Sequence, residues 1–147
     1  MTDHDREIVS SRLFDAPRER VFRAWSDPEL LARWWGPKGF TNTFHEFDFR
    51  PDGHWRFTMH APNGGNFANE NVFDEITPPE RITFRHISPP VFAVTATFTE
   101  QGAQTLLTYR MLFPTAEACA KVKSFAPAAN EENFDRLAAV LAHTSPI

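Results

Sequence analysis

The feature that most constrains the fold is a change of hydrophobic period: from residue 40 to residue 113, apolar residues recur at about every second position. Trp55, Phe57 and Met59, for example, alternate with polar residues. Turn signals divide this region into six segments, at residues 51–53, 63–65, 78–79, 89–90 and 101–102. Six consecutive strands with short connections predict an antiparallel meander. Phe44 and Phe47 differ in parity, which predicts a β-bulge near His45.

The flanking segments predict one more strand and several helices. Residues 7–14 contain β-branched residues and favour a strand, whereas Pro17 and the pair Asp27-Pro28 are helix-start signals for two short helices. A core-facing helical stripe comes near the C-terminus, at Phe134, Leu137, Ala138 and Leu141. We therefore expect one α+β domain over residues 1–147, in which a curved antiparallel sheet of about seven strands packs on a C-terminal helix.

Composition and charge exclude several classes of protein. The 147 residues suit a single domain, and 15 Lys and Arg against 19 Asp and Glu give a net charge of −4 without a basic cluster. We therefore expect no nucleic-acid partner. The start of the chain, residues 1–6, lacks the apolar stretch of a signal peptide, and no apolar run is long enough to span a bilayer. We expect a soluble, cytoplasmic protein with no membrane insertion.

Several local sequences resemble the START-like (SRPBCC, birch-pollen-allergen-like) superfamily. They are APRERVF at residues 16–22, DPEL at 27–30, WWGP at 34–37, DFRPDG at 48–53 and EITPPERITF at 75–84. Within that superfamily the chain is similar to the homologues of the activator of the heat-shock protein 90 ATPase, over nearly its whole length. The resemblance implies a helix-grip fold with a cavity between sheet and helix that takes apolar or amphipathic molecules. Ala129-Asn130 departs from the Gly-Trp that this family commonly has.

The large apolar residues of the inward face are the first candidates for ligand binding. Under the parity interpretation they converge on the interior: Trp55, Phe57, Met59, Phe73, Phe84, Phe92 and Phe134. A curved sheet packed on one helix also needs large residues simply to fill its core, so the same set has a purely structural explanation. Alanines in the terminal helix, such as Ala138, favour space beside the sheet.

Three polar residues share that inward parity. His86 aligns with Phe84, where an imidazole could orient a ligand or act as a base; the alternative is a core histidine bonded to a backbone carbonyl. Asn69 and Asn71 share parity with Phe73, so their amides are expected to orient one polar end of a ligand. The alternative for them is an edge strand with a reversed pleat, which would expose both.

Other chemistry has little support in the sequence. His45, His54 and His60 lack metal-ligand spacing, so we expect no metal and no cofactor, and Cys119 among alanines suits a small buried residue.

We therefore expect non-catalytic binding of a small hydrophobic or amphipathic molecule. One alternative is a polyketide cyclase-like enzyme that uses His86. A second is a co-chaperone-like module activating the heat-shock protein 90 ATPase, although we expect no chaperone partner. Exposed strand edges leave a homodimer open.

Overall fold

The structure is a computed structural model that describes residues 3–143. Its elements are, in order, the 3-10 helix η1 (Asp3–Arg6), β1 (Glu7–Phe14), α1 (Arg18–Ser26), α2 (Pro28–Trp34), β2 (Thr41–Phe47), β3 (His54–His60), β4 (Asn66–Thr77), β5 (Arg81–His86), β6 (Phe92–Gln101), β7 (Gln104–Leu112), α3 (Ala116–Lys123) and α4 (Ala126–His143). The expected α+β order is confirmed: one strand, two short helices, six strands and a long C-terminal helix.

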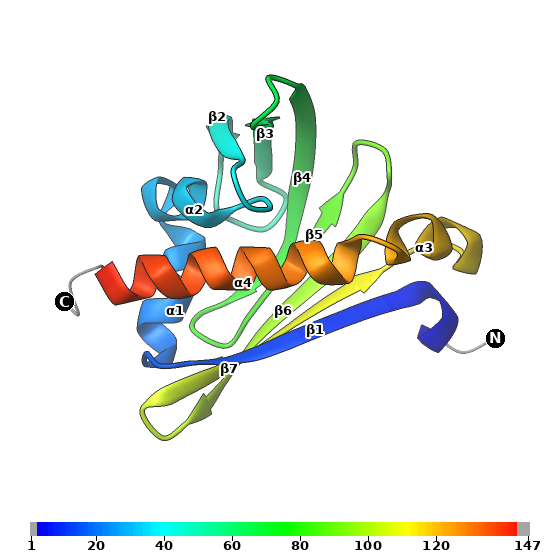
Figure 1. The fold of residues 1–147 in the computed structure, drawn as a ribbon. Coiled ribbons are helices and arrows are strands. Elements are labelled where there is room, and N and C mark those ends of the chain that lie inside the picture. Colours follow the sequence, from blue (N-terminus) through cyan, green and yellow to red (C-terminus); the bar gives the residue numbers. More distant parts are fainter. Residues whose placement is uncertain (1–2, 144–147) are drawn as a thin grey trace.

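The seven strands form one antiparallel sheet in the order β1-β7-β6-β5-β4-β3-β2. The meander from β2 to β7 is continuous, and β1 adds to its far edge by pairing with β7. Figure 1 shows α4 lying across the curved sheet, with α1 and α2 near its C-terminal end and α3 at its N-terminal end. This is the helix-grip arrangement, and it places the interior between the sheet and α4.

Local sequence signals explain where the elements begin and bend. Asp27 caps α2 by accepting a hydrogen bond at Oδ1 from the Glu29 amide at 3.0 Å, and Pro28 occupies the first turn. The expected bulge is present, because the β2–β3 register shifts between Phe44 and Glu46. A second shift, which the sequence did not signal, lies in β4 between Phe73 and Glu75 and leaves Glu75 exposed.

Aromatic rings fill the half of the interior beneath α1 and α2. The ring centroids of Trp25 and Trp34 are 5.0 Å apart, and those of Trp35 and Trp55 are 4.9 Å apart. Trp34 is also fixed by its indole Nε1, which donates to the Ala24 carbonyl at 2.9 Å. Such ring pairs stabilise the fold beyond their buried area. No helix in residues 3–143 has the length and apolar character needed to cross a membrane.

Candidate functional site

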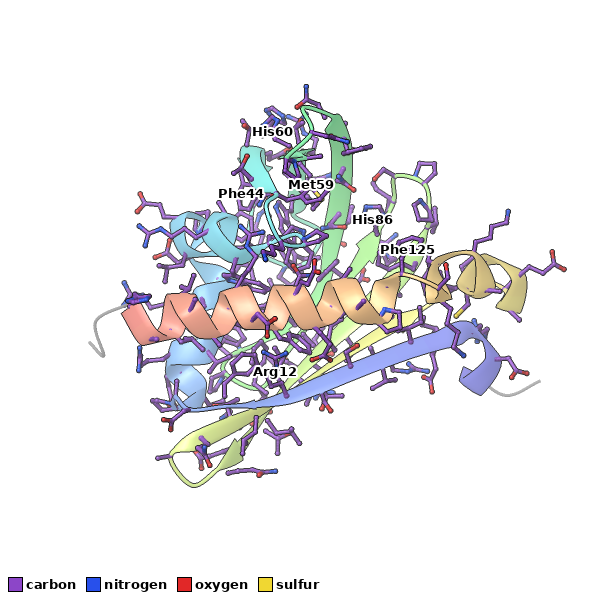
Figure 2. The ribbon with its side chains drawn as sticks, in the orientation of Figure 1. Arg12, Phe44, Met59, His60, His86 and Phe125 are labelled. Atoms are coloured by element: carbon purple, nitrogen blue, oxygen red, sulfur yellow. The ribbon has the colours of Figure 1, made fainter. Side chains whose placement is uncertain are left out.

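A cavity of about 270 Å³ lies between the sheet and the N-terminal half of α4. Its walls come from the α2–β2 loop, strands β3 to β7, the β5–β6 loop, α3 and α4. They are formed by Trp35, Gly36, Pro37, Phe57, Met59, Asn69, Asn71, Phe84, His86, Pro90, Phe92, Tyr109, Met111, Val122, Phe125, Ala126, Ala129, Asn130 and Asn133. Figure 2 shows His86 and Phe125 close to the end of α4 at which α3 joins. Phe125 is 58% exposed and so belongs to the rim.

Seven of the ten residues expected to bind a ligand line this cavity: Phe57, Met59, Asn69, Asn71, Phe84, His86 and Phe92. The other three, Trp55, Phe73 and Phe134, are buried but do not line it. Strand parity, and for Phe134 the apolar stripe of α4, do not separate these two groups, because they give the face of an element and not the position along the interior.

Packing explains why three predicted residues lie away from the cavity. Trp55 is covered by neighbouring rings and stacks on Phe57 with centroids 4.8 Å apart. Phe73 packs edge-on against Phe49 at 5.1 Å, which closes the interior at that end. Phe134 packs edge-on against Phe14 at 5.8 Å, further along α4 than the cavity. These rings form a packed core that supports the cavity without lining it.

Asn71 is the most unusual polar group in the lining. It is 1% exposed, and within the described residues neither its Nδ2 nor its Oδ1 has a hydrogen-bond partner. The strand register places it opposite Trp55 on β3 and opposite His86 on β5. A buried amide without partners costs free energy, so this position is costly unless a bound molecule supplies them.

His86 is held at both ring nitrogens. Nδ1 lies 2.8 Å from the Pro90 carbonyl oxygen, and Nε2 lies 2.8 Å from Oδ1 of Asn69 and 3.2 Å from Oγ of Ser88. Burial lowers the pKa of His86 below its ordinary value of 6.5, although backbone carbonyl contacts with Pro90 and Ser88 oppose that shift. The neutral imidazole therefore predominates at neutral pH. Its ring stacks on Phe92, with centroids 4.8 Å apart.

The reversed-pleat alternative for β4 does not hold for Asn71, since its side chain is buried. Asn69 is half-buried, and its Nδ2 donates to the Phe67 carbonyl at 3.0 Å. Phe67 itself is 53% exposed, so the inward face of β4 opens to solvent towards the β3–β4 turn.

The three histidines considered as metal ligands contact the side chains of other residues. His45 Nε2 lies 2.8 Å from Thr58 Oγ1, His54 Nδ1 lies 2.6 Å from Glu70 Oε2, and His60 contacts the side chains of Thr43 and Asn66. Among the described residues, no three His, Cys, Asp or Glu side chains are grouped so that they could hold a metal ion. Cys119 is a free, buried thiol.

Comparison with known proteins identifies the family. The model of the family described as "Activator of Hsp90 ATPase homolog 1-like protein" matches residues 15–142. The chain belongs to this family. Among solved structures of similar fold, a protein from Arthrobacter aurescens has a TM-score of 0.89 at 24% identity, covering 99% of this chain and 91% of its own. No curated protein matches the sequence.

Two further structures share the fold of this family member. A protein from Nitrosomonas europaea has a TM-score of 0.87 at 21% identity and covers 97% of both chains. A protein from Chromobacterium violaceum has a TM-score of 0.80 at 27% identity, covering 91% of this chain and 96% of its own. These matches show the helix-grip fold.

Several cavity residues of this family member were not among the predicted binding residues. Tyr109 and Met111 lie on the inward face of β7, and their alternation with polar residues is the signal that could have placed them there. Burial raises the pKa of the Tyr109 phenol far above its ordinary value, so it stays neutral. Asn130 and Asn133 reach the cavity from α4, one helical turn apart, and no apolar pattern in the sequence marks them.

Proposed function

We propose that this protein binds a small hydrophobic or amphipathic molecule, without chemical conversion, in the cavity between the sheet and α4. The observation that supports it is the cavity itself, about 270 Å³ in volume. That volume is close to the lower end of small-molecule sites, about 300–1,000 Å³. The mostly apolar walls with a few polar groups match the composition of such sites.

The contrast between the two halves of the interior supports this role. Close packing normally leaves few voids larger than a water molecule. The half beneath α1 and α2 follows that rule, because rings such as Trp25, Trp34 and Trp55 fill it. In the other half, the α4 wall presents the small side chains of Ala126 and Ala129 to the sheet, which leaves room for a ligand.

His86 fits a role in holding a ligand better than a role in catalysis. Its Nδ1 donates to the Pro90 carbonyl, and the ring has no carboxylate partner among the hydrogen bonds that fix it. An imidazole with a lowered pKa and no carboxylate partner is poorly suited to general acid–base catalysis at neutral pH. Its neutral ring, stacked on Phe92, instead forms part of the cavity wall.

Native mass spectrometry of the freshly purified protein, followed by solvent extraction, tests the proposal. We expect a lipophilic adduct at one molecule per chain, or stoichiometric uptake of a small apolar probe such as indane. Ala129→Phe, which fills the cavity, should abolish both, whereas Ala139→Phe on the exposed side of the same helix should retain them. An apo mass combined with no uptake of indane would overturn the proposal.

A further inference from the structure

The unpartnered carboxamide of Asn71 defines the chemistry of the ligand's polar end. We infer that the cavity recognises an uncharged molecule whose apolar body carries an N–H donor and a carbonyl acceptor side by side, as in a lactam or a primary carboxamide. This inference rests on the proposed ligand-binding function and assigns Asn71 as the residue that pairs with that group.

Two asparagines of the lining are buried, and they differ in their hydrogen bonds. Asn130 on α4 is 6% exposed, and its Nδ2 donates to Oγ of Ser10 at 3.1 Å. Asn71 is 1% exposed, and both of its side-chain polar atoms lack a partner within the described residues. Buried polar groups are paired in the great majority of cases, so an amide with neither atom paired indicates a missing partner.

The donor and the acceptor of a carboxamide determine which groups the missing partner must present. Its oxygen accepts and its nitrogen donates, and the two lie side by side in one plane. A group that presents a donor beside an acceptor satisfies both atoms at once, as when an asparagine side chain binds bidentately to the edge of adenine. A cis-amide edge, N–H beside C=O, has this pattern. A ketone has no donor, so it would satisfy only the nitrogen.

The walls of the cavity are formed by uncharged side chains. Within residues 3–143, the cavity lining contains no Lys, Arg, Asp or Glu, and its two titratable side chains, His86 and Tyr109, are both expected to be neutral. A carboxylate or an ammonium group would therefore be taken out of water without a counter-ion, which is strongly unfavourable. The walls thus favour an uncharged polar end over an ionised one.

The position of Asn71 also orients the ligand. Asn71 lies opposite His86 in the strand register, so the polar end of the ligand would sit near the imidazole, with the apolar body against rings such as Phe57 and Phe84. Across the cavity on α4, Oδ1 of Asn133 is also buried without a partner within the described residues. A second unpaired acceptor adds to the preference for a ligand that donates hydrogen bonds.

Calorimetric titration at neutral pH with four probes of similar size tests this inference: oxindole, a bicyclic lactam; N-methyloxindole, which lacks the donor; phenylacetate, an anion; and indane, a hydrocarbon. We expect oxindole to bind at least about tenfold more tightly than N-methyloxindole, and phenylacetate to bind more weakly than either. Asn71→Leu should remove the preference for oxindole over N-methyloxindole.

The outcomes separate the two proposals. Equal binding of oxindole, N-methyloxindole and indane would overturn the inference and leave the ligand-binding function intact. A preference for phenylacetate would also overturn it, as would an oxindole preference that survives Asn71→Leu. Failure of all four probes to bind would overturn the inference, and it would overturn the ligand-binding function as well only if native mass spectrometry also gives an apo mass. If Asn71→Leu does not fold, the probe series on the unaltered protein still decides.

Discussion

Oδ1 of Asn69 on β4 lies 2.8 Å from Nε2 of His86 on β5, while Nδ1 of the same ring donates to the Pro90 carbonyl. Asn69 Nδ2 donates to the Phe67 carbonyl, so Oδ1 is left as an acceptor. The neutral ring, protonated at Nδ1, can accept at Nε2 from the Ser88 hydroxyl at 3.2 Å. Only the imidazolium would donate to Asn69 Oδ1, so this contact favours the charged form against the effect of burial.

Stability should depend on pH through His86. Burial lowers the pKa of His86 below 6.5 in the folded protein, so near and below pH 6.5 the unfolded chain binds more protons at this residue. The contribution of His86 is therefore fully present above pH 6.5 and is lost as pH falls from 6.5 through the lower folded pKa. We expect urea denaturation to show this loss, and His86→Gln to reduce the pH dependence. An unchanged pH dependence in the variant would contradict the assignment.

A carboxylate at position 69 should reverse the direction of this pKa shift. In Asn69→Asp the new charge would lie beside Nε2 of His86, where it stabilises the imidazolium. NMR titration of the ring protons should then show a His86 pKa above that of the unaltered protein. Thr58→Asp, on the neighbouring strand but bonded to His45, provides the matched control and should leave the His86 pKa nearly unchanged. Equal shifts in both variants would indicate a general charge effect.

The free energy of unfolding should distinguish the two buried asparagines of the cavity. Asn71→Leu removes an amide without partners, so we expect the ligand-free protein to gain about 1–2 kcal/mol of stability. Asn130→Leu removes the partner of the buried Ser10 hydroxyl and should cost about 1–2 kcal/mol. Urea denaturation of both variants, after removal of any bound molecule, makes the comparison. Destabilisation by both would show that Asn71 has a partner in the empty protein.

The fold could be predicted in detail because its signals are local. Alternation set the inner face of strands such as β3, Asp27-Pro28 set the start of α2, and the changed parity of Phe44 and Phe47 located the bulge in β2. The second shift, in β4, had no such signal. Parity with Phe73 gave Asn71 an inward direction but left a reversed pleat open, and its burial decides between the two. These inferences need only neighbouring residues along the chain, and the three-dimensional packing preserved them.

The position of the cavity could not be predicted, because it depends on which rings meet across the interior. Trp35 lies in the α2–β2 loop, and its ring centroid is 4.9 Å from that of Trp55. Because Trp35 also lines the cavity, it separates the packed half of the interior from the half that contains the cavity. Its place follows from contacts between segments far apart in sequence. Parity alone therefore grouped Trp55 and Phe134 with the true lining residues.

Arg136 on α4 holds the loop that forms one wall of the cavity. Its Nη1 donates to the carbonyls of Trp35, Gly36 and Pro37 at 3.3, 2.8 and 3.0 Å, and its Nη2 donates to the carbonyl of Arg33 at 2.8 Å. The Arg33 carbonyl lies in the last turn of α2 and the other three follow its end, where a helix leaves acceptors unpaired. A single cationic side chain thus fixes the last turn of α2 and the loop that begins with Trp35.

Arg136→Met should destabilise the protein by about 2–3 kcal/mol, because it leaves these carbonyls without their charged donor. Arg136→Lys should recover only part of the loss, since an ammonium group cannot reproduce the planar fork of the guanidinium. Arg33→Met, at an exposed position in α2, is the matched control and should change stability by less than about 0.5 kcal/mol. Urea denaturation measures all three variants, and equal stability of Arg136→Met and Arg33→Met would show that the loop is held by other contacts.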